Sequence, residues 1–117
     1  MTCDYVGTKQ VTAWAEEKDG AAGYAVKYAD GYISWSPKDV FEGAYINIGH
    51  VGHLSQHQQR VIAEKCALEA KAKALSEFIG NNLVFLTLDP EEQERLKVQN
   101  DIMWQYFEIL ERRIAAF

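Results

Sequence analysis

The chain has 117 residues, of which 48% are hydrophobic, so it can form one domain or two very small ones that share a core. Its charged fraction of 25% is ordinary for a globular protein. Its net charge of −5 argues against non-specific binding of nucleic acid polymers, because such binding normally needs a basic surface.

The first part of the chain alternates between apolar and polar residues, as strands of a half-buried sheet do. We predict strands over Lys9–Ala15, Gly23–Tyr28 and Tyr32–Trp35, all rich in the aromatic and β-branched residues that sheets favour. Between the last two, Asp30 and Gly31 are expected to supply the positive φ angles of a tight hairpin turn. The pattern therefore predicts an antiparallel sheet.

A short helix is predicted to follow the sheet over Pro37–Ala44. Ser36 is expected to cap it, with proline at the first helical position and Asp39 completing a capping box. Two glycines between residues 49 and 54 then indicate a linker. We accordingly divide the chain into a sheet region, 1–49, and a helical region, 50–117, which are expected to form one compact unit.

Two long helices are predicted in the second part. Ser55 is expected to cap the first, which runs to Ile79 and is stopped by the Gly-Asn-Asn sequence that follows. After the apolar connection Leu83–Leu88, Asp89 and the proline after it begin a second helix that runs to the chain end. The fold class is thus α+β, with a small antiparallel sheet and a short helix followed by an antiparallel helical hairpin.

Each long helix carries more apolar surface than a hairpin can bury, which predicts self-association. The first has a stripe of large residues and a second stripe of small ones: Val61, Leu68, Ala72, Leu75 and Ile79, then Ala63, Ala67, Ala70 and Ala74. The last helix also has two: Leu96, Met103, Tyr106, Leu110, Ile114 and Phe117, then Ile102, Ile109 and Ala116. We therefore expect a homo-oligomer, a homodimer or a hexamer, although the alanines could merely raise helix propensity while the sheet covers the rest.

Three further features bear on location and on chemistry. No apolar run approaches the roughly 18–20 residues that cross a bilayer, and Cys3 and Cys66 form no disulfide framework. The N-terminus also lacks the apolar region of a signal peptide, so we expect a cytoplasmic protein with no membrane partner. The spacing of His50, His53 and His57 does not suit a metal site, because no carboxylate or cysteine lies at a suitable spacing nearby.

The sequence predicts neither an enzyme nor a bound cofactor. It contains no nucleophile elbow, no Walker loop, no metalloprotease motif, and no cysteine and histidine arrangement with an orienting partner. Its carboxylate pairs, Glu91 with Glu92 and Glu108 with Glu111, are explained by the helix dipole and by a solvated face.

Arginine and aromatic side chains are the candidate ligand contacts. The chain has only four arginines, and an antiparallel hairpin would bring Arg60, Arg112 and Arg113 to one end, where their guanidinium groups could hold phosphate. The competing interpretation is that the last two only stabilise the helix dipole while Arg60 pairs with Glu64. Most of the 14 aromatic residues should be core, but Phe85 in the connection is a candidate to stack on a base. Trp14 and Trp35 are further stacking candidates, although core packing is the better interpretation of Trp35.

Several stretches of the chain resemble a family of small phage proteins. The most specific are GYISWSPKDVFEGAY at residues 31–45 and HQQRV at residues 57–61, and the C-terminal YFEILERRIAAF adds to them. Together they resemble the first family of Thoeris anti-defence proteins, and the helical half alone is also similar to the second anti-CBASS family. The chain departs from the first family in the loop after Trp14, which is short.

The resemblance implies a phage sponge that binds cyclic nucleotide messengers of bacterial immunity and withholds them without cleaving them. The first family is associated with cyclic ADP-ribose isomers and the second with cyclic di- and trinucleotides, with pockets at subunit interfaces. Phe85 and Arg112 match positions associated with the pocket of the first family, and Arg60 matches a position associated with a second, cyclic-oligonucleotide pocket. Together with Arg113, Tyr106 and Trp14, these residues are the expected ligand contacts. The alternative is an oligomeric phage module that inhibits a host protein directly.

Overall fold

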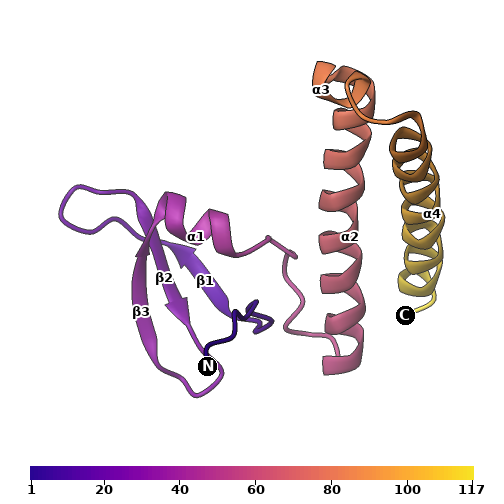
Figure 1. The fold of residues 1–117 in the computed structure, drawn as a ribbon. Coiled ribbons are helices and arrows are strands. Elements are labelled where there is room, and N and C mark those ends of the chain that lie inside the picture. Colours follow the sequence, from indigo (N-terminus) through magenta and orange to yellow (C-terminus); the bar gives the residue numbers. More distant parts are fainter. The chain divides into compact units, whose positions relative to one another are not determined.

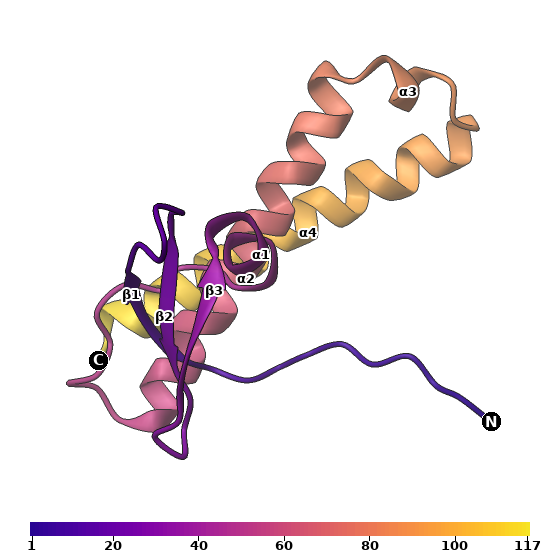
Figure 2. The ribbon, with the colours of Figure 1, turned by 90° about the vertical axis from the view of Figure 1, so that its left-hand side faces the viewer.

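The computed structural model describes residues 1–117 and divides into two compact units, Met1–Tyr45 and Ile46–Phe117. The first unit contains three strands and a short helix, and the second contains two long helices with a short one between them (Figures 1 and 2). The elements are β1 (Thr12–Ala15), β2 (Gly23–Lys27), β3 (Ile33–Pro37), α1 (Lys38–Ala44), α2 (Gln56–Asn81), α3 (Leu83–Leu86) and α4 (Pro90–Ala115). The predicted α+β fold class is confirmed.

The three strands form an antiparallel sheet in the order β1-β2-β3. Directly opposed residues share a face, so Trp14, Ala25 and Trp35 lie together on one side. Val26 lies on the other side and is 1% exposed. The predicted alternation of the strands is confirmed, whereas β1 begins at Thr12 rather than at Lys9.

The turn between β2 and β3 differs from the prediction. Only Gly31 has a positive φ in the second turn, where Gly31 donates its N–H to the Tyr28 carbonyl, as in a three-residue loop with a glycine bulge. The tight turn with positive φ at both central residues is Asp19-Gly20, between β1 and β2. The sequence contains both Asp-Gly pairs but does not show which of them forms the two-residue turn. The length of each turn depends on which residues on either side of it pair across the strands.

The predicted start of the short helix is wrong by one residue. Ser36 and Pro37 stay in β3, because Pro37 pairs with Gly23 and the Lys38 N–H donates to the Ala22 carbonyl. Pro37 is therefore the residue that precedes α1, no side chain caps the helix, and the Ser36 hydroxyl donates instead to the Pro37 carbonyl at 3.4 Å.

A stack of three aromatic rings holds α1 against the sheet. Phe41 lies between Tyr24 and Tyr45, with ring centroids 4.4 Å and 4.9 Å away. The Tyr24 hydroxyl also donates a 2.6 Å hydrogen bond to Glu42, and this bond raises the pKa of the tyrosine. Helix α1 therefore covers the Val26 face of the sheet and not the face of Trp14 and Trp35.

The ends of the long helices follow the capping rules only in part. The Ser55 hydroxyl accepts from the Gln58 N–H and the Gln58 side chain accepts from the Ser55 N–H, which completes a capping box and confirms the predicted start. Helix α2 continues through Gly80 to Asn81, two residues past the predicted end. The connection after it contains one helical turn, α3, in which the Val84 N–H donates to the Asn82 side-chain oxygen at 2.8 Å.

Helices α2 and α4 run antiparallel, side by side (Figure 1). The stripe of α4 that faces α2 is only partly the predicted one. Leu110 is fully buried, whereas Tyr106 and Phe117 are 40% and 45% exposed, so the aromatic residues of the interface are Trp104 and Phe107 instead. Residues 96, 100, 103, 107, 110 and 114 step by three and four along one face of α4, and the rotation of α4 about its axis turns this face toward α2 and leaves Tyr106 outside it.

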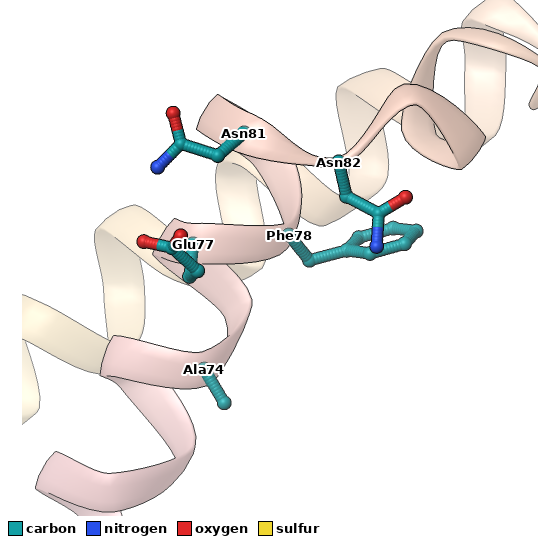
Figure 3. Close-up of a pocket in the computed structure, with 5 residues that line it drawn as sticks. All are labelled: Ala74, Glu77, Phe78, Asn81 and Asn82. Atoms are coloured by element: carbon teal, nitrogen blue, oxygen red, sulfur yellow. The ribbon is translucent and has the colours of Figure 1, made fainter.

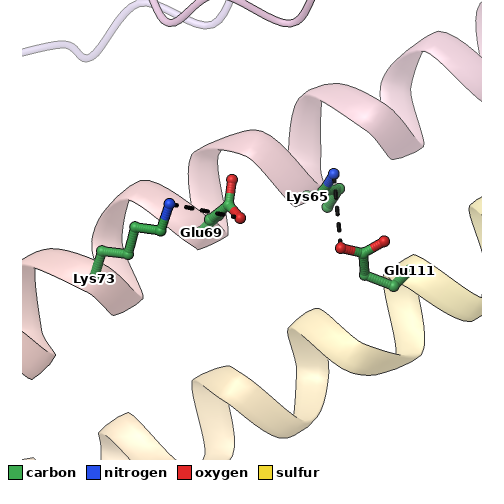
Figure 4. Close-up of polar contacts among 4 residues, drawn as sticks. All are labelled: Lys65, Glu69, Lys73 and Glu111. Carbon is green, nitrogen blue, oxygen red and sulfur yellow. Dashed lines mark ion pairs between the residues drawn. The ribbon is translucent and has the colours of Figure 1, made fainter.

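Charged contacts between the long helices are sparse. Lys65 on α2 lies 3.8 Å from Glu111 on α4, and Glu69 and Lys73 pair within α2 at 3.8 Å (Figure 4). Both are partly exposed pairs of the kind that contributes little to stability. No helix of the chain combines the length and the apolar content that a membrane span requires.

A polar cluster at the middle of the hairpin fixes its register. Asn100 on α4 donates to the Ala72 carbonyl at 3.0 Å and accepts from the Ser76 hydroxyl at 2.9 Å. Trp104 donates its indole N–H to the same hydroxyl at 3.0 Å. Since a one-turn slip of α4 would leave all these groups unpaired in a part-buried interface, the cluster selects one alignment of the two helices.

We expect Ser76→Ala to lower the free energy of unfolding by about 1–3 kcal/mol, because the Trp104 indole N–H and the Asn100 side-chain oxygen both lose the Ser76 hydroxyl as a partner. The measurement is urea unfolding at fixed protein concentration. The double variant Ser76→Ala with Trp104→Phe removes the stranded N–H and should recover part of the loss. A single variant as stable as the unmodified protein would contradict this role.

Candidate ligand-binding site

The three candidate arginines lie at one end of the hairpin. Arg60 is in the second turn of α2 and Arg112 and Arg113 are in the last turn of α4, and the antiparallel contact between Lys65 and Glu111 shows that these turns are neighbours. All three side chains are exposed and make no ion pair or hydrogen bond within the chain. Arg60 does not pair with Glu64, so three guanidinium groups remain available to an external anion.

Phe85 lies at the opposite end of the hairpin. The stretch of α2 between Arg60 and Asn81 separates the two ends by about 30 Å at 1.5 Å per residue. The Phe85 ring is 3% exposed and meets the Phe78 ring edge to face, with centroids 5.9 Å apart. A single chain therefore cannot bring Phe85 and the arginines to one ligand.

Lys97 is a candidate contact at the Phe85 end that sequence reasoning missed. Its Nζ lies 6.0 Å from the centroid of the Phe85 ring, so a cation and an aromatic side chain lie together there. Only the fold of α3 brings them together, and the sequence spacing of the two residues carries no signal of it.

The remaining two candidates occupy different surfaces. Tyr106 lies on α4 and is 40% exposed. Trp14 is 43% exposed and belongs to the sheet unit, beside Ala25 on the face that α1 does not cover. Trp35 on the same face donates its indole N–H to the Glu16 carbonyl at 2.7 Å, which is the behaviour of a packed residue.

Two shallow hollows lie in the helical unit. One, of about 340 Å³, is at the C-terminal end of α2 and is lined by Ala74, Glu77, Phe78, Asn81 and Asn82. Figure 3 shows the Asn82 amide beside the Phe78 ring, while Glu77 and Asn81 point to the other side of the helix. The other hollow, of about 380 Å³, is lined by Asp89, Pro90 and Glu91. Neither contains a predicted ligand contact, and acidic lining does not suit a phosphate.

Metal-ligating and nucleophilic side chains are not organised into a centre. No group of three or more His, Cys, Asp or Glu side chains is positioned to hold a metal ion. Burial raises the pKa of the Cys66 thiol, which favours the neutral form over the thiolate that nucleophilic chemistry needs. What the unit offers a ligand is therefore charge and aromatic surface.

Comparison with protein families matches residues 55–116 to one family, Sequestin. The match covers all of α2, α3 and α4, and more than half of the chain. The chain belongs to the Sequestin family. Searches of curated proteins and of solved structures give no match.

Membership in the Sequestin family identifies a sequestering protein and agrees with the sponge that the sequence resemblance implied. The matched segment contains five of the six candidate ligand contacts and leaves Trp14 outside it. The Sequestin match lies within the helical unit and includes no residue of the sheet.

Proposed function

We propose that the protein sequesters a cyclic nucleotide messenger of bacterial immunity, such as a cyclic ADP-ribose isomer or a cyclic di- or trinucleotide, without cleaving it. The observation that carries the proposal is the set of three exposed, unpaired arginines at one end of a Sequestin hairpin. Guanidinium groups bind phosphate through two parallel hydrogen bonds, and nothing in the chain satisfies them otherwise.

The candidate contacts lie at opposite ends of one hairpin, so the proposal requires an oligomer. Phe85 can stack on the base of a ligand held by Arg112 only if the two side chains come from different chains, because about 30 Å of α2 separates them within one chain. A pocket enclosed between subunits also slows release of the ligand, and slow release is what withholding a messenger requires.

The test is ligand depletion followed by recovery. The purified protein is mixed with a cyclic ADP-ribose isomer, the free ligand is measured after filtration, and the protein is then denatured by heat. The proposal expects the ligand to disappear and to return intact. A thermal-shift panel of cyclic nucleotides identifies the tightest ligand, because binding to the folded state raises the Tm by mass action. Return of a cleaved product would show an enzyme, and no shift with any member would contradict the proposal.

Arg112→Ala should weaken binding of the identified ligand at least tenfold and leave the Tm of the ligand-free protein unchanged. The first effect follows from loss of a charge-assisted contact to phosphate, and the second from the absence of any partner for this side chain within the chain. Calorimetric titration measures the first and a thermal melt the second. Lys71→Ala, which removes another exposed cation without a partner, is the control and should bind normally.

Phe85 needs a different variant because its ring is buried. Truncation to alanine would remove a core ring and cost about 3–5 kcal/mol, so lost binding could reflect lost structure. Phe85→Leu keeps most of the apolar volume and removes the flat ring. We expect weaker binding with an unchanged oligomer mass.

A direct inhibitor of a host protein is the second candidate function. The observation in its favour is α3, whose Leu83, Val84 and Leu86 are 80%, 55% and 67% exposed and form an apolar tip. This function predicts that no cyclic nucleotide binds by calorimetry. It also predicts that Leu83→Ser with Leu86→Ser abolishes capture of one host partner.

A further inference from the structure

A base can stack on Phe85 only if a neighbouring side chain moves. The Phe85 ring is 3% exposed, and the Nζ of Lys97 lies over it, 6.0 Å from the centroid. Paired aromatic rings have centroids about 4.5–7 Å apart, so the Lys97 ammonium occupies the space that a stacked base would take. Lys97 must therefore leave the ring before a base can stack there.

No carboxylate holds Lys97 in place. Glu94 precedes it by three residues on α4 and Asp101 follows it by four, which are the spacings at which ion pairs form within a helix. Neither carboxylate pairs with Lys97, and the lysine side chain is exposed. Only the weak attraction between the ammonium and the ring is left to hold it. A phosphate offers the ammonium a stronger, charge-assisted hydrogen bond.

Lys97 is also the one basic residue without a carboxylate partner at this end of the hairpin. Between residues 77 and 101 the chain has two basic residues, and the other, Arg95, pairs with Glu92 at 2.8 Å. The same stretch has six carboxylates: Glu77, Asp89, Glu91, Glu92, Glu94 and Asp101. Without Lys97, a phosphate near Phe85 would therefore meet a net negative charge from this part of the chain.

We propose that Lys97 gates Phe85 and makes this site selective for phosphorylated nucleotides. Without a ligand, the ammonium covers the ring. The phosphate of an arriving nucleotide draws the ammonium away, and the base takes the uncovered side of the ring. A neutral nucleoside offers the ammonium no new partner, so it must displace Lys97 without compensation. The gate deepens the proposed function and rests on it, because it concerns the same contact between Phe85 and a base.

The first experiment is calorimetric titration of the full chain with two probes that share the adenine base, a cyclic ADP-ribose isomer and adenosine. Lys97→Ala removes the cover and the charge together. It should weaken binding of the cyclic ADP-ribose isomer by about tenfold or more and should tighten binding of adenosine. A residue that only supports the fold would weaken both. Changes of the same sign for the two probes, or no change for either, would overturn the proposal.

Two further variants test whether the charge is responsible. Lys97→Arg keeps a cation of similar reach and should restore most of the affinity for the cyclic ADP-ribose isomer. Lys71→Ala removes an exposed cation of α2 and should change neither affinity. All three variants should melt at the Tm of the unmodified protein, because both lysines are exposed and form no ion pair. A Lys97→Arg protein that binds no better than Lys97→Ala would contradict the gate.

The covered state of Phe85 can be tested without a nucleotide. Reductive methylation with ¹³C labels the lysines and keeps their charge, and the Lys97 signal is the one that Lys97→Ala lacks. A methyl group over an aromatic ring resonates upfield, so this signal should lie upfield of the Lys71 signal and lose the displacement in Phe85→Leu. Inorganic pyrophosphate should move it downfield in the unmodified protein. A Lys97 signal without the displacement, or one that pyrophosphate does not move, would overturn the gate.

The gate and the proposed function fail separately. A protein that binds no cyclic nucleotide, but whose displaced Lys97 signal responds to pyrophosphate, would contradict the proposed messenger and support the gate. A protein that sequesters the cyclic ADP-ribose isomer equally well with Lys97→Ala would contradict the gate alone.

Discussion

Leu110→Ala is expected to lower the free energy of unfolding of the helical unit by about 2–5 kcal/mol, because it leaves a cavity in the contact between α2 and α4. Leu110 is 0% exposed and is one of the two largest fully buried side chains of the chain. Small domains have only about 5–15 kcal/mol of stability, so this single change removes a large share of it. The measurement is urea denaturation followed by helical circular dichroism, which should show a lower midpoint.

Leu83→Ala is the matched control for this prediction. It makes the same chemical change at a leucine of α3 that is 80% exposed, and so it creates no cavity. The control should change the free energy of unfolding by less than about 0.5 kcal/mol. Equal effects of the two variants would show that α2 and α4 do not pack through Leu110.

Gly23→Ala is expected to destabilise the sheet unit by about 1–3 kcal/mol, because β2 has no space for a side chain at this residue. A Cβ at Gly23 would lie 2.5 Å from the Ser36 carbonyl oxygen and would also collide with the indole of Trp35. The carbonyl belongs to the neighbouring strand, so relief of the collision requires strand β3 to move. Amide hydrogen exchange of β2 and β3 should accelerate at least fivefold.

Gly43→Ala tests whether that effect is specific to the site. Gly43 lies in α1, a Cβ there would meet nothing within 4 Å, and its φ is not positive. Alanine restricts the unfolded chain and favours the helix, so this variant should be more stable by about 0.5–1 kcal/mol. Protection of Gly23→Ala equal to that of the unmodified protein would show that Trp35 does not lie over β2.

Local signals in the sequence predicted the elements well, because they depend on residues close in the chain. Ser55 capped α2 as expected, and period-two alternation placed Tyr24 and Val26 on one face of β2. The errors arose where pairing with residues far away in the sequence determines the local structure. Ser36 has the features of a helix cap, yet pairing of β3 with β2 keeps it in the strand.

The apolar stripes of α4 were likewise predicted only in part. The sequence indicated that α4 has more apolar surface than one partner covers, and the structure leaves Ile102 and Ile109 exposed. It did not indicate that Tyr106 belongs to the exposed set and Trp104 to the contact with α2. That assignment depends on the rotation of α4 about its axis, which Asn100 and Ser76 fix through hydrogen bonds across the interface.

By itself the sequence determined the α+β fold class, the helical hairpin and the grouping of Arg60 with Arg112 at one end of it, because each follows from local pattern and chain direction. Only the tertiary structure decided that Phe85 is buried at the other end, with Lys97 beside it. The physical reason is that burial depends on how α3 folds back onto α2, a contact between residues whose sequence spacing carries no signal of it.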